Sequence, residues 1–196
     1  MSIVLVGSTS GSITLQEPAV AGTTTISLPA ASGTALVAPT ALTVPNTTGT
    51  VMVSGNIPAF NAYRSGSVQT FSATTWTKLQ FNSEYLDTNN CYDTSNNRFT
   101  PNVAGYYLFT LTPLISASSS FIEVYLQFYK NGAGINQYAL WSLISGTFNT
   151  IAPSIQAIVE MNGTSDYMEG FAYVGATSPQ FNTGGGVFTG VLLRNT

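Results

Sequence analysis

The chain has 196 residues, of which 44% are hydrophobic and 7% are charged, and its formal net charge is −3. This length and apolar content suit one substantial domain with its own core and exclude a disordered chain. The five cations are scattered, histidine is absent and cysteine occurs once, so we expect no nucleic-acid binding, no thiolate metal site and no internal disulfide framework.

The residue types favour strands over helices throughout. Gly, Thr, Ser, Asn, Tyr and Phe are abundant, a bias typical of sheets and turns. No apolar run reaches the roughly 20 residues that would span a bilayer, and no basic residue precedes the apolar run Ile3 to Val6. We therefore expect an all-β protein without a signal peptide or membrane insertion.

Residues 1–55 differ in composition from the rest and are predicted to form a separate segment of short β-repeats. They contain no aromatic residue and no cation. Residues 28–37 align with residues 44–53 at a constant offset, and three positions carry the repeat: Leu28 and Val44, Pro29 and Pro45, Gly33 and Gly49. Each unit is predicted to be a short strand, a proline bend, a Gly-Thr turn and another strand.

Such small side chains would stabilise this segment only against neighbouring chains or along another protein. A flexible linker is the alternative interpretation. The repeated Val and Leu positions favour ordered structure.

The second predicted domain, residues 56–196, begins after Asn56-Ile57-Pro58, where aromatic residues become frequent. Strands are expected at 59–65 and 75–82, the second with Trp76 and Lys78 opposite its apolar face. A polar loop is expected from Glu84 to Asn97 because Asn, Asp and Ser dominate it.

The stretch 97–111 carries the strongest strand signal in the chain. From residue 99 on, its odd-numbered positions are apolar or aromatic residues, proline or glycine: Phe99, Pro101, Val103, Gly105, Tyr107, Phe109 and Leu111. This two-residue period is typical of a strand with one buried face. Pro101 cannot donate to a central ladder, so we predict a short strand, a corner at 102–105 and then a long strand.

Further strands are predicted over the remaining chain, at 121–130, 138–144, 150–161, 167–174 and 187–194. Asn131-Gly132 and Asn162-Gly163 are tight-turn signals, and Gly184-Gly185-Gly186 is expected to form a loop before the last strand. The total of eight to ten strands indicates a sandwich or jelly roll.

The motifs in this second domain resemble the globular head of complement C1q, which shares the tumour necrosis factor (TNF) jelly roll. The resemblance rests on Phe99-x-Pro101-x-x-x-Gly105-x-Tyr107-x-Phe109, the Asn131-Gly132 turn and the closing Phe188-x-Gly190-x-Leu192. It implies a ten-stranded jelly roll whose core signature is Phe99, Pro101, Gly105, Tyr107, Phe109, Phe188, Gly190 and Leu192. It also implies a homotrimer, for which Tyr106, Tyr125 and Tyr129 are candidate contacts.

The N-terminal segment resembles the low-charge β-repeats that precede binding heads in tailed-phage virion proteins, including those of cyanophages. The resemblance lies in Leu-Pro-Ala-Ala-x-Gly-Thr after Ala-Gly-Thr-Thr-Thr. It implies a virion surface protein, made in the host cytoplasm, whose N-terminal segment contacts capsid or tail proteins. We expect a homotrimeric capsid decoration protein (a cement or head-fibre protein).

Three other functions remain open at this stage. The head could belong to a receptor-binding tail fibre, or it could be a free module that binds a host surface protein or glycan. Paired acids for glycoside hydrolysis can be imagined, but solvated loop acids are far commoner, so we expect no enzyme and no cofactor. Glu84, Asp87 and Asp93 are weak candidates for calcium ligands; they lack the spacing of a known calcium loop, so a hydrated loop is preferred.

Overall fold

The computed structural model describes residues 3–6, 12–15, 57–139 and 148–196. The chain divides into two units, Met1–Asn46 and Thr47–Thr196. In the first unit, β1 (Ile3–Val6) pairs antiparallel with β2 (Ser12–Leu15). The six residues that carry the predicted repeat, 28 to 49, lie outside the described residues, so the repeat and the boundary at residue 55 stay predictions.

The second unit is all-β, as predicted, and no helix occurs in the part of the chain that the structure describes. In this part of the chain there is accordingly no helix long and apolar enough to span a membrane. The strands of this unit are β3 (Ala59–Tyr63), β4 (Gln69–Thr70), β5 (Thr77–Lys78), β6 (Ser83–Asp87), β7 (Tyr92–Asp93), β8 (Arg98–Phe99), β9 (Gly105–Ser116), β10 (Glu123–Lys130), β11 (Ala133–Ala139), β12 (Thr150–Ile151), β13 (Ile155–Met161), β14 (Met168–Gly175) and β15 (Gln180–Asn195).

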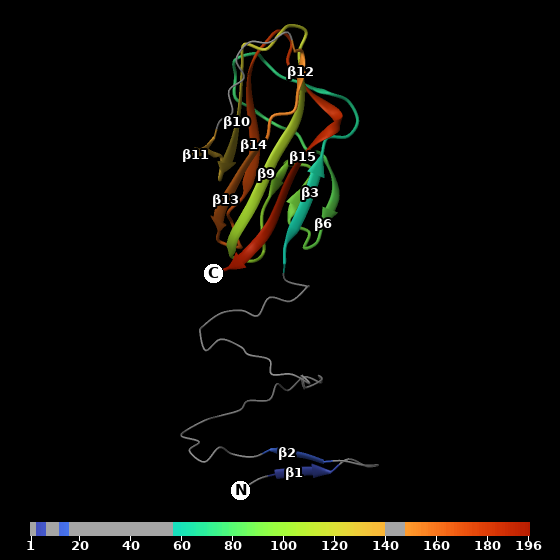
Figure 1. The fold of residues 1–196 in the computed structure, drawn as a ribbon, viewed down its shortest axis with the longest axis vertical. Helices are drawn as coiled ribbons and strands as arrows, with labels where there is room; N and C mark the ends of the chain where they lie inside the picture. The colour runs from blue at the N-terminus through green and yellow to red at the C-terminus, as the bar shows by residue number, and fades with distance from the viewer. Residues whose placement is uncertain (1–2, 7–11, 16–56, 140–147) are drawn as a thin grey trace. The chain divides into compact units, whose positions relative to one another are not determined.

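These strands form two antiparallel sheets (Figure 1). The six-stranded sheet has the order β11-β10-β14-β8-β7, and β5 also pairs with β14. The seven-stranded sheet has the order β12-β9-β15-β3-β6, with β13 beside β9 and β4 beside β15. Described strands outnumber the ten expected because five of them are two-residue pieces: β4, β5, β7, β8 and β12.

Aromatic rings fill the space between the sheets. Phe188 of β15 lies 4.9 Å from Phe60, 6.2 Å from Phe109 and 6.2 Å from Phe128, measured between ring centroids. Phe60 and Phe109 belong to the seven-stranded sheet, whereas Phe128 comes from the six-stranded sheet. All four side chains are buried, so this cluster joins the two layers by apolar burial and ring packing.

The stretch around Pro101 has the predicted form. β8 is a short strand, residues 100–104 turn the corner, and β9 runs for 12 residues with strict alternation of buried and more exposed positions. β9 then lies between β15 and both β12 and β13, so it is an interior strand of its sheet.

The predicted polar loop 84–97 is wrong in its first half. Ser83–Asp87 form β6 at the edge of the seven-stranded sheet, and Tyr92 and Cys91 are buried. An edge strand tolerates polar and exposed side chains on both faces, so it lacks the alternation that reveals a strand in sequence.

Three other predicted boundaries also differ. The glycines 184–186 do not form the expected loop before the last strand. They lie inside β15, where Gly184 and Gly186 have φ of 73° and 89° and the register against β9 shifts. The strand expected at 150–161 is interrupted at 152–154, because Pro153 has no N–H to donate. The strand expected at 138–144 begins earlier, at Ala133, and most of that range lies outside the described residues.

Candidate functional site

The core signature residues face the interior of the sandwich. Phe99, Tyr107, Phe109 and Phe188 are fully buried, and Leu192 is 5% exposed. The other three positions, Pro101, Gly105 and Gly190, are buried as well. These residues build the scaffold, so a binding function has to come from the outer faces and loops.

Gly190 allows a close approach between β15 and the core rings. A Cβ at this position would lie 2.5 Å from Cε1 of Phe60 and 2.8 Å from Cδ1 of Phe109. Gly105 is comparable, since a Cβ there would overlap the backbone of Arg194. Glycine is required at these two positions because rings or backbone occupy the space that a side chain would need.

The outer face of the seven-stranded sheet carries an apolar row across four strands. Ile158 pairs with Leu108, Leu108 with Val191, and Val191 with Ala59. Ile158 is 51% exposed and Val191 is 36% exposed. Tyr106, at 39% exposure, pairs with Glu160 and Arg194 at the end of the same face. We call Ala59, Tyr106, Leu108, Ile158 and Val191 the apolar face.

The other two tyrosines proposed as trimer contacts lie on the opposite sheet. Tyr125 and Tyr129 project from β10 on the side opposite to the buried Val124, Leu126 and Phe128. The structure therefore does not bring the three candidate tyrosines together.

Tyr125 and Tyr129 instead join an aromatic cluster on the outer face of the six-stranded sheet. Tyr125 lies 5.6 Å from Tyr173, Tyr173 lies 5.8 Å from Trp76, and Trp76 lies 6.4 Å from Tyr129. Tyr129 stacks on Phe171 at 3.7 Å. We call these five rings the aromatic patch. In the sequence, Trp76 is predicted to lie opposite the apolar face of its strand, but Trp76, Phe171 and Tyr173 were not predicted as site residues. Only the cross-strand register of β5, β10 and β14 brings these rings together.

Charged groups border the aromatic patch. The hydroxyl of Tyr125 donates to Oε2 of Glu123 at 3.0 Å. Partial desolvation and the same carboxylate raise the pKa of the Tyr173 hydroxyl. Lys78 pairs with Glu169 at 2.7 Å, and the Glu169 side chain is only 7% exposed. The patch thus combines ring surface with hydrogen-bonding groups.

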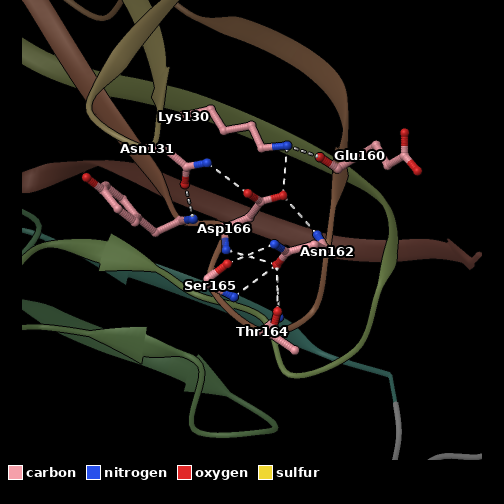
Figure 2. Close-up of polar contacts among 8 residues, drawn as sticks. Lys130, Asn131, Glu160, Asn162, Thr164, Ser165 and Asp166 are labelled. Carbon is pink, nitrogen blue, oxygen red and sulfur yellow. Dashed lines mark hydrogen bonds and ion pairs between the residues drawn. The ribbon is translucent and has the colours of Figure 1, made fainter.

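A polar network ties the β10–β11 turn to the loop between β13 and β14 (Figure 2). Asp166 accepts from Nδ2 of Asn131 at 2.8 Å and pairs with Nζ of Lys130 at 2.8 Å. It also accepts from the backbone N–H of Asn162 at 2.9 Å. Burial opposes ionisation of Asp166, but these hydrogen bonds and the Lys130 charge outweigh it and hold the pKa of the carboxyl below its usual value.

Both Asn-Gly sequences are fixed by this network. Asn131 and Gly132 have φ of 55° and 78°, as a tight hairpin turn requires, and Oδ1 of Asn131 accepts from the backbone N–H of Tyr167. Oδ1 of Asn162 accepts from the backbone N–H groups of residues 164, 165 and 166, which fold the loop into a compact turn.

The weak calcium candidates are not assembled into a cation site. Asp87 accepts from the backbone N–H groups of Asn89 and Tyr92, and Asp93 accepts from those of residues 95 and 96. Glu84 and Asp93 line a surface pocket of ≈ 500 Å³ to which Asp87 does not contribute. Within the described residues, no group of three or more His, Cys, Asp or Glu side chains could hold a metal ion.

Cys91 lies in the core rather than on a loop surface. It is 5% exposed, and its Sγ lies 3.5 Å from the carbonyl oxygen of Asn89. Burial raises the pKa of the thiol. This residue therefore behaves as a small apolar core side chain.

Solved structures of C1q-type and TNF-type domains resemble the second unit. The globular domain of zebrafish complement 1qA protein matches with a TM-score of 0.52 at 17% sequence identity, over 71% of this chain and 99% of that one. Eiger TNF from S. frugiperda gives 0.49 at 8% identity over 71% and 93% of the two chains, and murine APRIL gives 0.45 at 11% over 70% and 99%. No protein-family model matches the chain, and no curated protein does.

The head is a C1q/TNF-like jelly roll, as the sequence motifs predicted. The match to the complement domain shows this fold. At 17% sequence identity, the match shows the fold alone and no function. What the head does must be argued from its own surfaces.

Proposed function

We propose that the chain is a virion structural protein of a tailed phage: a homotrimeric capsid decoration protein, anchored by its N-terminal segment and exposing the jelly-roll head. The homotrimer rests on the apolar face. Ile158, Leu108 and Val191 form a continuous row on the outer face of the seven-stranded sheet, and burying such a row against neighbouring copies removes apolar surface from water.

The composition supports self-association through this face. The chain carries few charges, and Tyr106 adds a rigid amphipathic ring beside Glu160 and Arg194, which can form polar contacts at the rim. Three copies around an axis form a closed assembly, in which each chain uses the same surfaces. The C1q-type resemblance implies the same stoichiometry.

The virion location rests on the N-terminal sequence. Residues 28–53 contain a repeat with small side chains and no charge, which favours packing along another protein surface. In this proposal the N-terminal segment attaches the head to the particle. The chain is proposed to act by binding, with no catalytic step. A receptor-binding tail fibre is the second candidate, because the same two-part design also suits a tail.

Two measurements test the proposal. Sedimentation equilibrium of the full chain should give about three times the 20.7 kDa chain mass. Immunogold labelling of intact phage particles should then place the head on the capsid. Label confined to the tail would replace decoration with the tail-fibre candidate, and a trimer absent from particles would support a free binding module.

A further inference from the structure

We infer that the aromatic patch on the six-stranded sheet is a binding site for a neutral glycan. The inference deepens the proposed function, on which it rests, by naming what the exposed head recognises. The apolar face and the aromatic patch lie on different sheets, so an assembly that buries the first leaves the second facing outward.

The patch is an outward surface rather than a part of the core. Phe171 and Tyr173 alternate with the buried Ala172 and Val174 along β14, and Tyr125 faces Tyr173 across the β10–β14 pair. Trp76 is 36% exposed. These rings add little to the interior, which Phe109, Phe128 and Phe188 already fill, so their clustering needs another explanation.

The ring chemistry matches the apolar side of a sugar. An aromatic face carries the negative part of the ring quadrupole, and the C–H groups on one side of a pyranose ring are weakly positive. Three adjacent ring pairs of the patch are tilted by 54° to 62°, whereas Tyr129 and Phe171 are stacked at 20°. The tilted rings form a contoured surface suited to one or a few sugar rings.

The polar border matches the hydroxyl groups of a sugar. The Glu123 carboxylate beside Tyr125 and Tyr173 can accept hydrogen bonds from neighbouring sugar hydroxyls. The tyrosine hydroxyls can both donate and accept. A protein partner would have to match this alternation of ring and hydroxyl with many side chains, whereas one pyranose ring offers both.

Charge decides between neutral and anionic glycans. Lys78 pairs with Phe171 across the β5–β14 ladder, and its ammonium is paired with Glu169. Lys130 follows Tyr129 in the chain, and its ammonium is paired with Asp166. Glu123 is bonded to a neutral hydroxyl, and the whole chain has a net charge of −3. A sialylated or sulfated glycan is itself negative and would be repelled by the negative charge of the protein. The complementary ligand is therefore uncharged.

The experiment applies the full-length protein to an array of neutral oligosaccharides (gluco-, manno-, galacto- and N-acetylglucosamine-based) with sialyllactose and sulfated glycans as the anionic set. The strongest neutral ligand is then titrated by calorimetry. We expect neutral binding, and we expect Trp76→Ala and Tyr173→Ala each to weaken it by about tenfold or more. Tyr85→Ala is the matched control, because Tyr85 is a 68% exposed ring on β6 of the other sheet and should leave binding unchanged.

Thermal unfolding of each variant checks that the head folds, and Trp76→Phe, which keeps a ring, should retain most of the affinity. No neutral binding, binding only to anionic glycans, or equal affinity in wild type and Trp76→Ala would overturn the inference. Sedimentation of the same samples separates it from the proposed function: a trimer that binds no glycan rejects the site alone, and a monomer that binds glycan rejects the trimer alone.

Discussion

At the residue scale, Asp166 shows how a single carboxylate fixes two loops of the head. It accepts from Asn131 and from the Asn162 backbone and pairs with Lys130. The sequence marked both Asn-Gly turns, but it did not join them through Asp166. Asn131 and Asp166 are 35 positions apart in the chain, and only the pairing of β10 with β14 brings them together.

The lowered pKa of Asp166 predicts a pH dependence of stability. A carboxyl whose pKa is lower in the folded than in the unfolded chain, where it is about 3.9, stabilises the fold above that value and loses this contribution as the pH falls through the folded pKa. We expect Asp166→Asn to lower the free energy of unfolding at pH 7 by about 1–3 kcal/mol. The loss between pH 7 and pH 3 should be smaller than in wild type.

Urea unfolding at the two pH values measures this effect. Glu84→Gln is the control, since Glu84 is an exposed carboxylate on the edge strand β6. Equal acid sensitivity of wild type and Asp166→Asn would contradict the assignment of this role to Asp166.

The burial of Cys91 predicts an unreactive thiol. The side chain is 5% exposed and its pKa is raised by burial, so little thiolate is present and reagent access is blocked. In native conditions we expect no rapid reaction with Ellman's reagent, and one thiol per chain should react after unfolding. Ser95→Cys, at an exposed position, should add one fast-reacting thiol. Rapid labelling of wild type would show that Cys91 is accessible.

At the element scale, β9 and β15 are the longest described strands of the head and pair with each other. The sequence predicted β9 more completely than β15. The alternation from Gly105 to Leu111 identified β9 because one side of this interior strand is buried throughout. β15 was predicted only from Val187 onward, because three consecutive glycines look like a loop. Pairing with β9 on both sides of the glycines keeps them in the strand as a bulge.

The close packing at Gly190 in β15 makes a direct prediction. Gly190→Ala would place a Cβ 2.5 Å from the Phe60 ring, so the rings must shift, and we expect a loss of about 1–3 kcal/mol in the free energy of unfolding. Thr189→Ala is the matched control on the outward side of the same strand. Thermal and urea unfolding would measure both, and a Gly190→Ala variant as stable as Thr189→Ala would show that the core relaxes at no cost.

At the scale of the whole molecule, the two sheets present different outer surfaces. The seven-stranded sheet carries the apolar face, and the six-stranded sheet carries the aromatic patch. The three tyrosines that the resemblance suggested as trimer contacts are divided between them. Tyr106 belongs to the first surface, and Tyr125 and Tyr129 belong to the second.

The apolar face predicts which substitution breaks the trimer. Ile158→Lys places a charge in the middle of the row, and burying that charge would be unfavourable, so we expect the mass in solution to fall towards that of one chain. Ile122→Lys is the control, because Ile122 is 73% exposed and precedes β10 of the other sheet. Sedimentation equilibrium distinguishes the two variants. A trimer that survives Ile158→Lys would place the interface elsewhere.

The sequence by itself determined the fold class and the core. Alternation of large apolar residues reveals a strand with one buried face, and the spacing of Phe99, Gly105, Tyr107 and Phe109 marked the C1q-type head. Only the tertiary structure decided which side chains lie together on the outer faces of the two sheets. Edge strands such as β6 and outward residues such as Trp76 and Tyr173 leave no periodic signal, because their neighbours come from distant strands. Register, which is fixed by the whole sandwich, brings those side chains together.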